Sequence, residues 1–220
     1  MTIRISTFSD IEFKLTEDVV GVTLSGGIDS AVMLRYLSTE FPDVTFIPFH
    51  GMENLRPQTV EAVQRILDHI PSPNIEDMVV YPIYSKVVYS EKKRGMDEQG
   101  KVPQMNDFYN SYGLQEIVMA MNCLPNKEVL SQWGCDYYSP DRMRRDRPIY
   151  ERFDNFHYYK PIVNHDKRIT KELFDYLGLD DDFLSLTSSC TGFPHETNYY
   201  TKPCGKCYHC HEKSWVFGKL

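Results

Sequence analysis

The sequence contains no long apolar run. No uninterrupted apolar segment approaches the ~20 residues that a membrane-spanning helix needs. The first ten residues, MTIRISTFSD, lack the apolar stretch of a secretory signal peptide. We therefore expect a protein with no membrane partner that is located in the cytoplasm.

An excess of positive charge is also lacking. The chain has 24 Lys and Arg residues against 31 Asp and Glu residues, which gives a net charge of −7. Because broad nucleic-acid binding depends on a basic face, we do not expect a nucleic acid as partner, although a local basic pocket is not excluded. The 220 residues, 41% of them hydrophobic, suffice for one sizeable core with a small appendage. The oligomeric state stays open, a homodimer included.

Two familiar phosphate-binding patterns are missing as well: a Walker A lysine and a G-x-G-x-x-G turn. In their place, the apolar run 19–24 leads into Ser25-Gly26-Gly27-Ile28-Asp29-Ser30. A plain turn needs neither both serines nor the aspartate, and this pattern arises by chance on the order of 10⁻⁶ per window. Glycines leave room for a phosphate, and the N–H groups of a following helix point at it. Asp29 either contacts a magnesium ion or caps that helix.

Hydrophobic periodicity predicts strands that alternate with helices. This alternation is typical of a doubly wound parallel sheet, which binds ligands beyond the carboxyl ends of its strands. A mobile loop is predicted at 90–106. The predicted strands are 19–25, 44–50, 78–85 and 128–134, the helices are 30–40, 57–70, 107–122 and 170–177, and a short hairpin is predicted within 3–15.

Four of the six cysteines lie in the last 31 residues, as Cys190-x13-Cys204-x2-Cys207-x2-Cys210. Without a secretory signal, this clustering favours a metal over disulfides. Four thiolates fill a tetrahedral zinc site and leave no open position, so a structural zinc ion is expected. An iron–sulfur cluster, redox chemistry at the C-x-x-C pairs, and replacement of one cysteine by His195, His209 or His211 remain alternatives.

The glycine-rich stretch resembles the pyrophosphate loop, or PP-loop, of the ATP pyrophosphatase superfamily. The resemblance implies an adenine-nucleotide hydrolase-like fold and cleavage of ATP between its α- and β-phosphates. It also implies that ATP and magnesium are held by the loop, which consists of Leu24, Ser25, Gly26, Gly27, Ile28, Asp29 and Ser30.

The PP-loop combined with the C-terminal cysteines resembles the 7-cyano-7-deazaguanine synthase family. The segment YKPIVNHDKRITKELFDYLGL and the segment DYYSPDRMR at 136–144 are also similar to that family. The chain departs from the family in four places. Its substrate segment lacks the usual cysteine and has Ser139 where a tyrosine is usual, and PFHGMENLRPQ replaces the usual motif after the second strand. The cysteine spacer is longer, and the N-terminal hairpin is extra.

The resemblance implies a reaction and a set of roles. ATP would adenylate the carboxylate of 7-carboxy-7-deazaguanine, and ammonia would displace AMP to give an amide. A second adenylation, of the amide oxygen, followed by loss of AMP would give the nitrile. Asp29, Arg142 and Lys167 are the expected catalytic residues, and Tyr138, Asp141 and Arg142 are expected to bind the substrate. The expected domains are an ATP-binding α/β domain with the hairpin at 1–160 and a helical zinc-binding region at 161–220.

Several nearby residues carry open alternatives. Arg144, Arg145 and Arg147 are expected mostly in a solvated loop, and Tyr137, Tyr138 and Phe193 either stack on a purine-like ring or pack in the core. Cys135 is either a nucleophile or, with more support, a buried thiol. The rival functions are a tRNA-thiolating or lysidine-forming PP-loop enzyme, a relative that attaches a deazapurine-type group to protein or DNA, and a nucleotide-binding module without catalysis.

Overall fold

The computed structural model of the chain describes the fold in seven stretches. These are residues 11–53, 58–83, 101–133, 141–153, 155–192, 196–198 and 201–220. Among the helices in these stretches, none combines the length and the apolar character that crossing a membrane would take.

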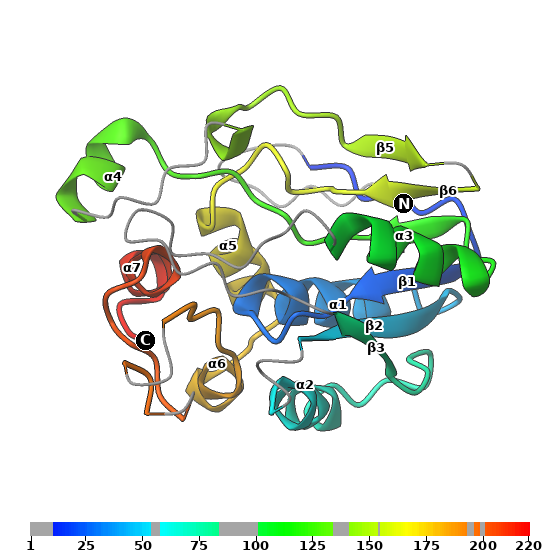
Figure 1. Cartoon of the computed structure of the whole chain (residues 1–220), viewed down its shortest axis with the longest axis horizontal. Coiled ribbons are helices and arrows are strands. Elements are labelled where there is room, and N and C mark those ends of the chain that lie inside the picture. The colour runs from blue at the N-terminus through cyan, green and yellow to red at the C-terminus, as the bar shows by residue number, and fades with distance from the viewer. Residues whose placement is uncertain are drawn as a thin grey trace.

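A six-stranded sheet organises the chain, with the strand order β3-β2-β1-β4-β6-β5 (Figure 1). Neighbouring strands pair in parallel, except that β5 runs antiparallel to β6 at one edge. The strand order reverses between β1 and β4, which makes this the switch point where such sheets bind ligands. The strands are β1 (Val19–Thr23), β2 (Thr45–Glu53), β3 (Val79–Ile83), β4 (Glu116–Val118), β5 (Tyr150–Phe153) and β6 (Phe156–Tyr159).

Helices cover both faces of the sheet. Their bounds are α1 (Ile28–Glu40), α2 (Thr59–Asp68), α3 (Lys101–Ser111), α4 (Lys127–Trp133), α5 (Arg168–Tyr176), α6 (Asp181–Leu186) and α7 (Tyr208–Phe217), and a 3₁₀ helix spans Asp141–Met143.

The core has two layers, one on each face of the sheet, because successive side chains of a strand point to opposite faces. Val118 joins the cluster formed by α1, α2, α5 and α6, whereas the preceding residue, Ile117, joins an aromatic cluster beneath α3. Tyr159 and Tyr158 divide in the same way. The mixed α/β class and the mostly parallel sheet are therefore confirmed, and they are consistent with an adenine-nucleotide hydrolase-like fold.

The fourth predicted strand is wrong. Residues 128–134 were expected to be extended, but α4 occupies Lys127–Trp133. The Asn126 side chain accepts a hydrogen bond from the Val129 N–H at 3.0 Å, which is the bond of a helix N-cap. Asn126 is thus the sequence signal for the start of this helix, whereas the apolar residues that follow it favour a strand.

The real fourth strand, β4, lies inside the predicted helix 107–122. It has only three residues, so it shows no alternation, and all three are buried between β1 and β6. The helix before it, α3, begins at Lys101, so the end of the loop predicted at 90–106 is helical. Residues 90–100 lie outside the described stretches.

Two further predictions differ at the sheet edge. Of the hairpin predicted within 3–15, residues 11–15 form no strand, and residues 3–10 lie outside the described stretches. The antiparallel pair β5–β6 was not predicted, because its strands have four residues each and β5 is mostly exposed.

The short helix α6 leads directly toward the PP-loop. Its N-cap is Asp180, whose side chain accepts a hydrogen bond from the Phe183 N–H at 3.0 Å. Phe183 and Leu184 then enter the core cluster that contains α1. The cap therefore fixes the start of the chain segment that passes along the loop.

We expect Asp180→Ala to lower the free energy of unfolding by about 1 kcal/mol, because the Phe183 N–H loses its acceptor. Asp180→Asn should stay close to the wild type, since asparagine caps equally well. Chemical denaturation of the three proteins measures both values. Equal losses in the two variants would show that the cap does not contribute in this way.

Candidate active site

The PP-loop lies at the carboxyl end of β1, where the chain turns into α1 at the switch point of the sheet. Gly26 has a φ of +85°, a conformation that L side chains rarely adopt. The exposed Ser25 accepts a hydrogen bond from the Gly27 N–H at 3.3 Å, and its Oγ lies 3.2 Å from Ser30 Oγ. Ser30 Oγ in turn donates to the Gly27 carbonyl at 3.0 Å. The two serines thus hold the loop in a closed turn.

The start of α1 offers donors to an anion. Its N-cap is Gly27, and no side chain caps it. Because the first N–H groups of a helix lack intrahelical partners, they are free to point at a negatively charged group. The alternative that Asp29 caps α1 is therefore not observed.

A histidine that sequence reasoning missed supports the loop from β2. His50 Nδ1 lies 2.8 Å from the Leu24 carbonyl oxygen, and its Nε2 lies 2.9 Å from Thr59 Oγ1 of α2. This buried ring joins the end of β1 to the start of α2. The residue sits near the carboxyl end of an apolar strand, and that position was the available signal.

Asp29 accepts hydrogen bonds from three side chains in two parts of the chain. Its Oδ2 lies 2.5 Å from Lys167 Nζ. Its Oδ1 accepts from Thr170 Oγ1 at 2.6 Å and from Asn122 Nδ2 at 3.0 Å. The loop carboxylate is thereby fixed by α5 and by the segment that follows β4.

Lys167 also faces a second carboxylate, Glu212 of α7, at 3.5 Å from Nζ to Oε2. Both side chains are only 1% exposed. Burial lowers the pKa of Lys167, but Asp29 and Glu212 outweigh it and raise this pKa above its ordinary value. Burial raises the pKa of Glu212, whereas Lys167 and Arg142 oppose that change. The lysine thus stays charged between two carboxylates.

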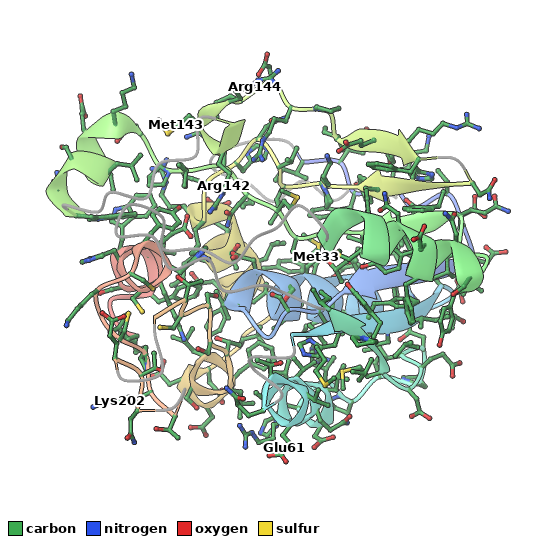
Figure 2. The ribbon with its side chains drawn as sticks, viewed as in Figure 1. Met33, Glu61, Arg142, Met143, Arg144 and Lys202 are labelled. Atoms are coloured by element: carbon green, nitrogen blue, oxygen red, sulfur yellow. The ribbon has the colours of Figure 1, made fainter. Side chains whose placement is uncertain are left out.

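Arg142 belongs to the same cluster. Its Nη2 donates to Asn122 Oδ1 at 2.6 Å and lies 3.6 Å from Glu212 Oε1, while its guanidinium carbon lies 5.3 Å from the centroid of the Tyr208 ring. Figure 2 shows Arg142 inside the molecule and Arg144 at the outer rim. Arg144 pairs there with Asp146.

The other two arginines of this segment differ from each other. Arg145 is exposed and donates to the Leu124 carbonyl at 2.7 Å. Arg147 is buried, against the expectation of a solvated residue, and it donates to the Asn122 carbonyl at 3.0 Å and to the Val163 carbonyl. It braces the segment that carries Asn122.

Some of the predicted site residues cannot be placed. Asp141 begins the 3₁₀ helix, but its side chain lies outside the described part. Tyr137, Tyr138 and Cys135 lie outside the described stretches, as do Phe193 and His195. Their roles stay predictions.

The sulfur atoms of the four C-terminal cysteines lie within 4.8 Å of one another. Backbone N–H groups donate to them, from Cys204 to Cys190 Sγ and from Cys207 to Cys204 Sγ, both at 3.2 Å. Hydrogen bonding between Cys190 and Cys207 lowers the pKa of Cys207 and raises that of Cys190 to about 11. Four clustered sulfurs are a donor set that suits zinc, and among the described residues no histidine joins the group.

The cluster is connected to the PP-loop through the segment between α6 and Cys190. The Ser188 N–H donates to the Gly26 carbonyl at 2.8 Å. Lys213 of α7, whose pKa burial lowers to about 8, donates to the carbonyls of Leu184 at 3.1 Å and Thr187 at 2.9 Å. Helix α7 therefore holds this segment against the loop.

No protein-family model and no curated protein sequence matches the chain. Among solved structures, the chain is similar to the structure of NMN synthetase from Francisella tularensis, with 16% sequence identity and a TM-score of 0.46. The match covers 91% of this chain and 77% of that one. A likeness at this level decides nothing about substrate or activity.

We expect one zinc ion per chain in the purified protein and its loss in Cys207→Ser, with unfolding of at least the C-terminal region. Structural zinc binding is worth ~10–16 kcal/mol, which is comparable to the ~5–15 kcal/mol of whole-domain stability. Elemental analysis together with circular dichroism measures both effects. Cys123→Ala, which lies outside the cluster, should keep its zinc. Iron in the preparation, or a folded protein without metal, would contradict the assignment.

Proposed function

We propose that the chain is an ATP-dependent ligase that cleaves ATP between the α- and β-phosphates and adenylates a carboxylate. One observation supports this above the others. The three residues that the sequence predicts to be catalytic lie far apart in the chain but meet in one cluster at the switch point. Asp29 pairs with Lys167, and the Asn122 side chain bonds to both Asp29 and Arg142.

The loop fits the phosphates of ATP. Ser25 and the N-terminus of α1 offer donors, and Gly26 keeps side chains away from the place where a phosphate would lie. Asp29 offers carboxylate oxygens, which magnesium prefers. Bound magnesium would neutralise charge on the phosphates, and Lys167 would add a positive charge beside them.

For the substrate, we propose 7-carboxy-7-deazaguanine with ammonia as the nucleophile. A carboxylate oxygen is a poor leaving group until it is adenylated, and this explains the need for ATP. Arg142 would bind the carboxylate with two parallel N–H donors, since its planar fork matches that group. Asn122 and Glu212 hold the guanidinium in place for this task. We further propose that Cys190, Cys204, Cys207 and Cys210 hold a structural zinc ion.

Release of pyrophosphate tests this function. Purified protein with ATP, magnesium, 7-carboxy-7-deazaguanine and ammonia should release pyrophosphate, and mass spectrometry should detect the nitrile. Omission of the deazapurine should abolish the release. If pyrophosphate appears only with tRNA, or with another carboxylate, the deazaguanine assignment is wrong although the ATP chemistry stands. If ATP binds and no acceptor supports turnover, the chain is a binding module.

Ser25→Ala should weaken ATP binding about tenfold to a hundredfold, because a hydrogen bond to a charged group contributes roughly 1.5–3 kcal/mol. Ser38→Ala provides the matched control. Ser38 lies near the far end of α1 and donates to the Arg35 carbonyl, so its loss should leave ATP affinity unchanged. Calorimetric titration with ATP measures both. ATP affinity equal to that of the wild type in Ser25→Ala would mean that the loop is only a turn.

Arg142→Lys should reduce turnover about tenfold to a hundredfold and leave ATP affinity unchanged, because lysine cannot form the bidentate pair. Arg144→Ala should retain turnover, since Arg144 is exposed and its pair with Asp146 lies at the surface. Steady-state kinetics with the deazapurine as the varied substrate compares the two. Full activity of Arg142→Lys would remove this arginine from the proposed role.

A further inference from the structure

Lys167 lies between two carboxylates at unequal distances. Its ammonium is 2.5 Å from Asp29 Oδ2 and 3.5 Å from Glu212 Oε2. The shorter contact is to the loop residue that the proposed function assigns to magnesium. An ammonium and a magnesium ion compete for the same carboxylate, so the lysine has to give up part of its contact before Asp29 can serve the metal.

Releasing Asp29 would be costly if the lysine had no other partner. Lys167 is 1% exposed, and a buried cation that loses its counter-ion costs several kcal/mol. Glu212 removes most of this cost because its carboxylate already faces the ammonium.

Other side chains hold Glu212 in place independently of the lysine. Tyr208 OH donates to Glu212 Oε1 at 2.5 Å, and Arg142 Nη2 lies 3.6 Å from the same oxygen. Thr170 and Asn122 likewise hold Asp29 Oδ1, so the loop carboxylate does not follow the lysine. The lysine is therefore the movable member between two fixed carboxylates.

We propose that Glu212 is a positioning residue, the second counter-ion that receives Lys167 when Asp29 turns to magnesium. This inference rests on the proposed function, because it supposes that the loop binds ATP with magnesium. It adds a role that the sequence motifs did not indicate, for a residue two positions after Cys210 on α7. The helix that carries Cys210, and that begins directly after Cys207, thereby also sets the charge balance of the loop.

The test is the magnesium dependence of ATP binding, measured by equilibrium dialysis with ATP and MgCl₂. Glu212→Gln should raise the half-saturating magnesium concentration at least about tenfold, because Lys167 then stays on Asp29. Glu172→Gln is the control. Glu172 is a partly buried carboxylate on α5, and its variant should follow the wild-type curve. The same magnesium dependence in Glu212→Gln and the wild type overturns the inference.

A second comparison separates this role from a general loss of negative charge or of structure. In the Lys167→Met background no ammonium competes for Asp29, so adding Glu212→Gln should change the magnesium dependence by less than about twofold. This pair of variants also gives an answer if Glu212→Gln alone does not fold. A shift as large as in the wild-type background would show that Glu212 acts otherwise. Failure of the wild type to bind ATP at all would instead overturn the proposed function, and the inference with it.

Discussion

The ion pair between the partly buried Asp29 and the buried Lys167 is the contact on which the arrangement of the site depends. It joins the first turn of α1 to the residue before α5, 138 positions further along the chain. A buried pair is stable only when the remaining polar atoms are satisfied. Here Thr170 and Asn122 donate to the carboxylate, and Glu212 balances the lysine.

Those partners come from elements that the fold brings to one edge of the sheet. Asn122 follows β4, Thr170 lies on α5, and Glu212 lies on α7. The parallel sheet provides this convergence, because β1 and β4 are adjacent and both point toward the site. The cysteine cluster contributes through α7 and through the segment that bonds to Gly26. A metal bound there would therefore stabilise the loop as well as the C-terminal region.

The sequence predicted the parts that carry strong local signals. The first three strands are apolar runs, the helices α2 and α5 have clear amphipathic periodicity, and the cysteine spacing predicted a cluster that the structure brings together. The short strand β4 could not be predicted, because three buried residues have no period. The α4 segment differs from the prediction for another reason. Its apolar residues favour a strand and outweigh the capping signal of Asn126.

The site was predictable only in part. Asp29, Arg142 and Lys167 were found through motifs, and the structure places them in one network. Glu212, Asn122 and His50 were missed because each acts through a long-range contact that no spacing encodes. A glutamate after a cysteine motif looks like a solvated charge until the fold buries it beside a lysine.

A double-mutant cycle of Asp29 and Lys167 tests the central claim, that this ion pair holds the site together. The free energy of unfolding is measured for Asp29→Asn, Lys167→Met and the double variant. Asp29→Asn leaves Lys167 with the longer contact to Glu212, and Lys167→Met leaves the Asp29 carboxylate without its cation, so the two single losses should together exceed the loss in the double variant by at least about 1 kcal/mol. Losses that add to within about 0.5 kcal/mol would show that the two residues are independent, and would contradict the account.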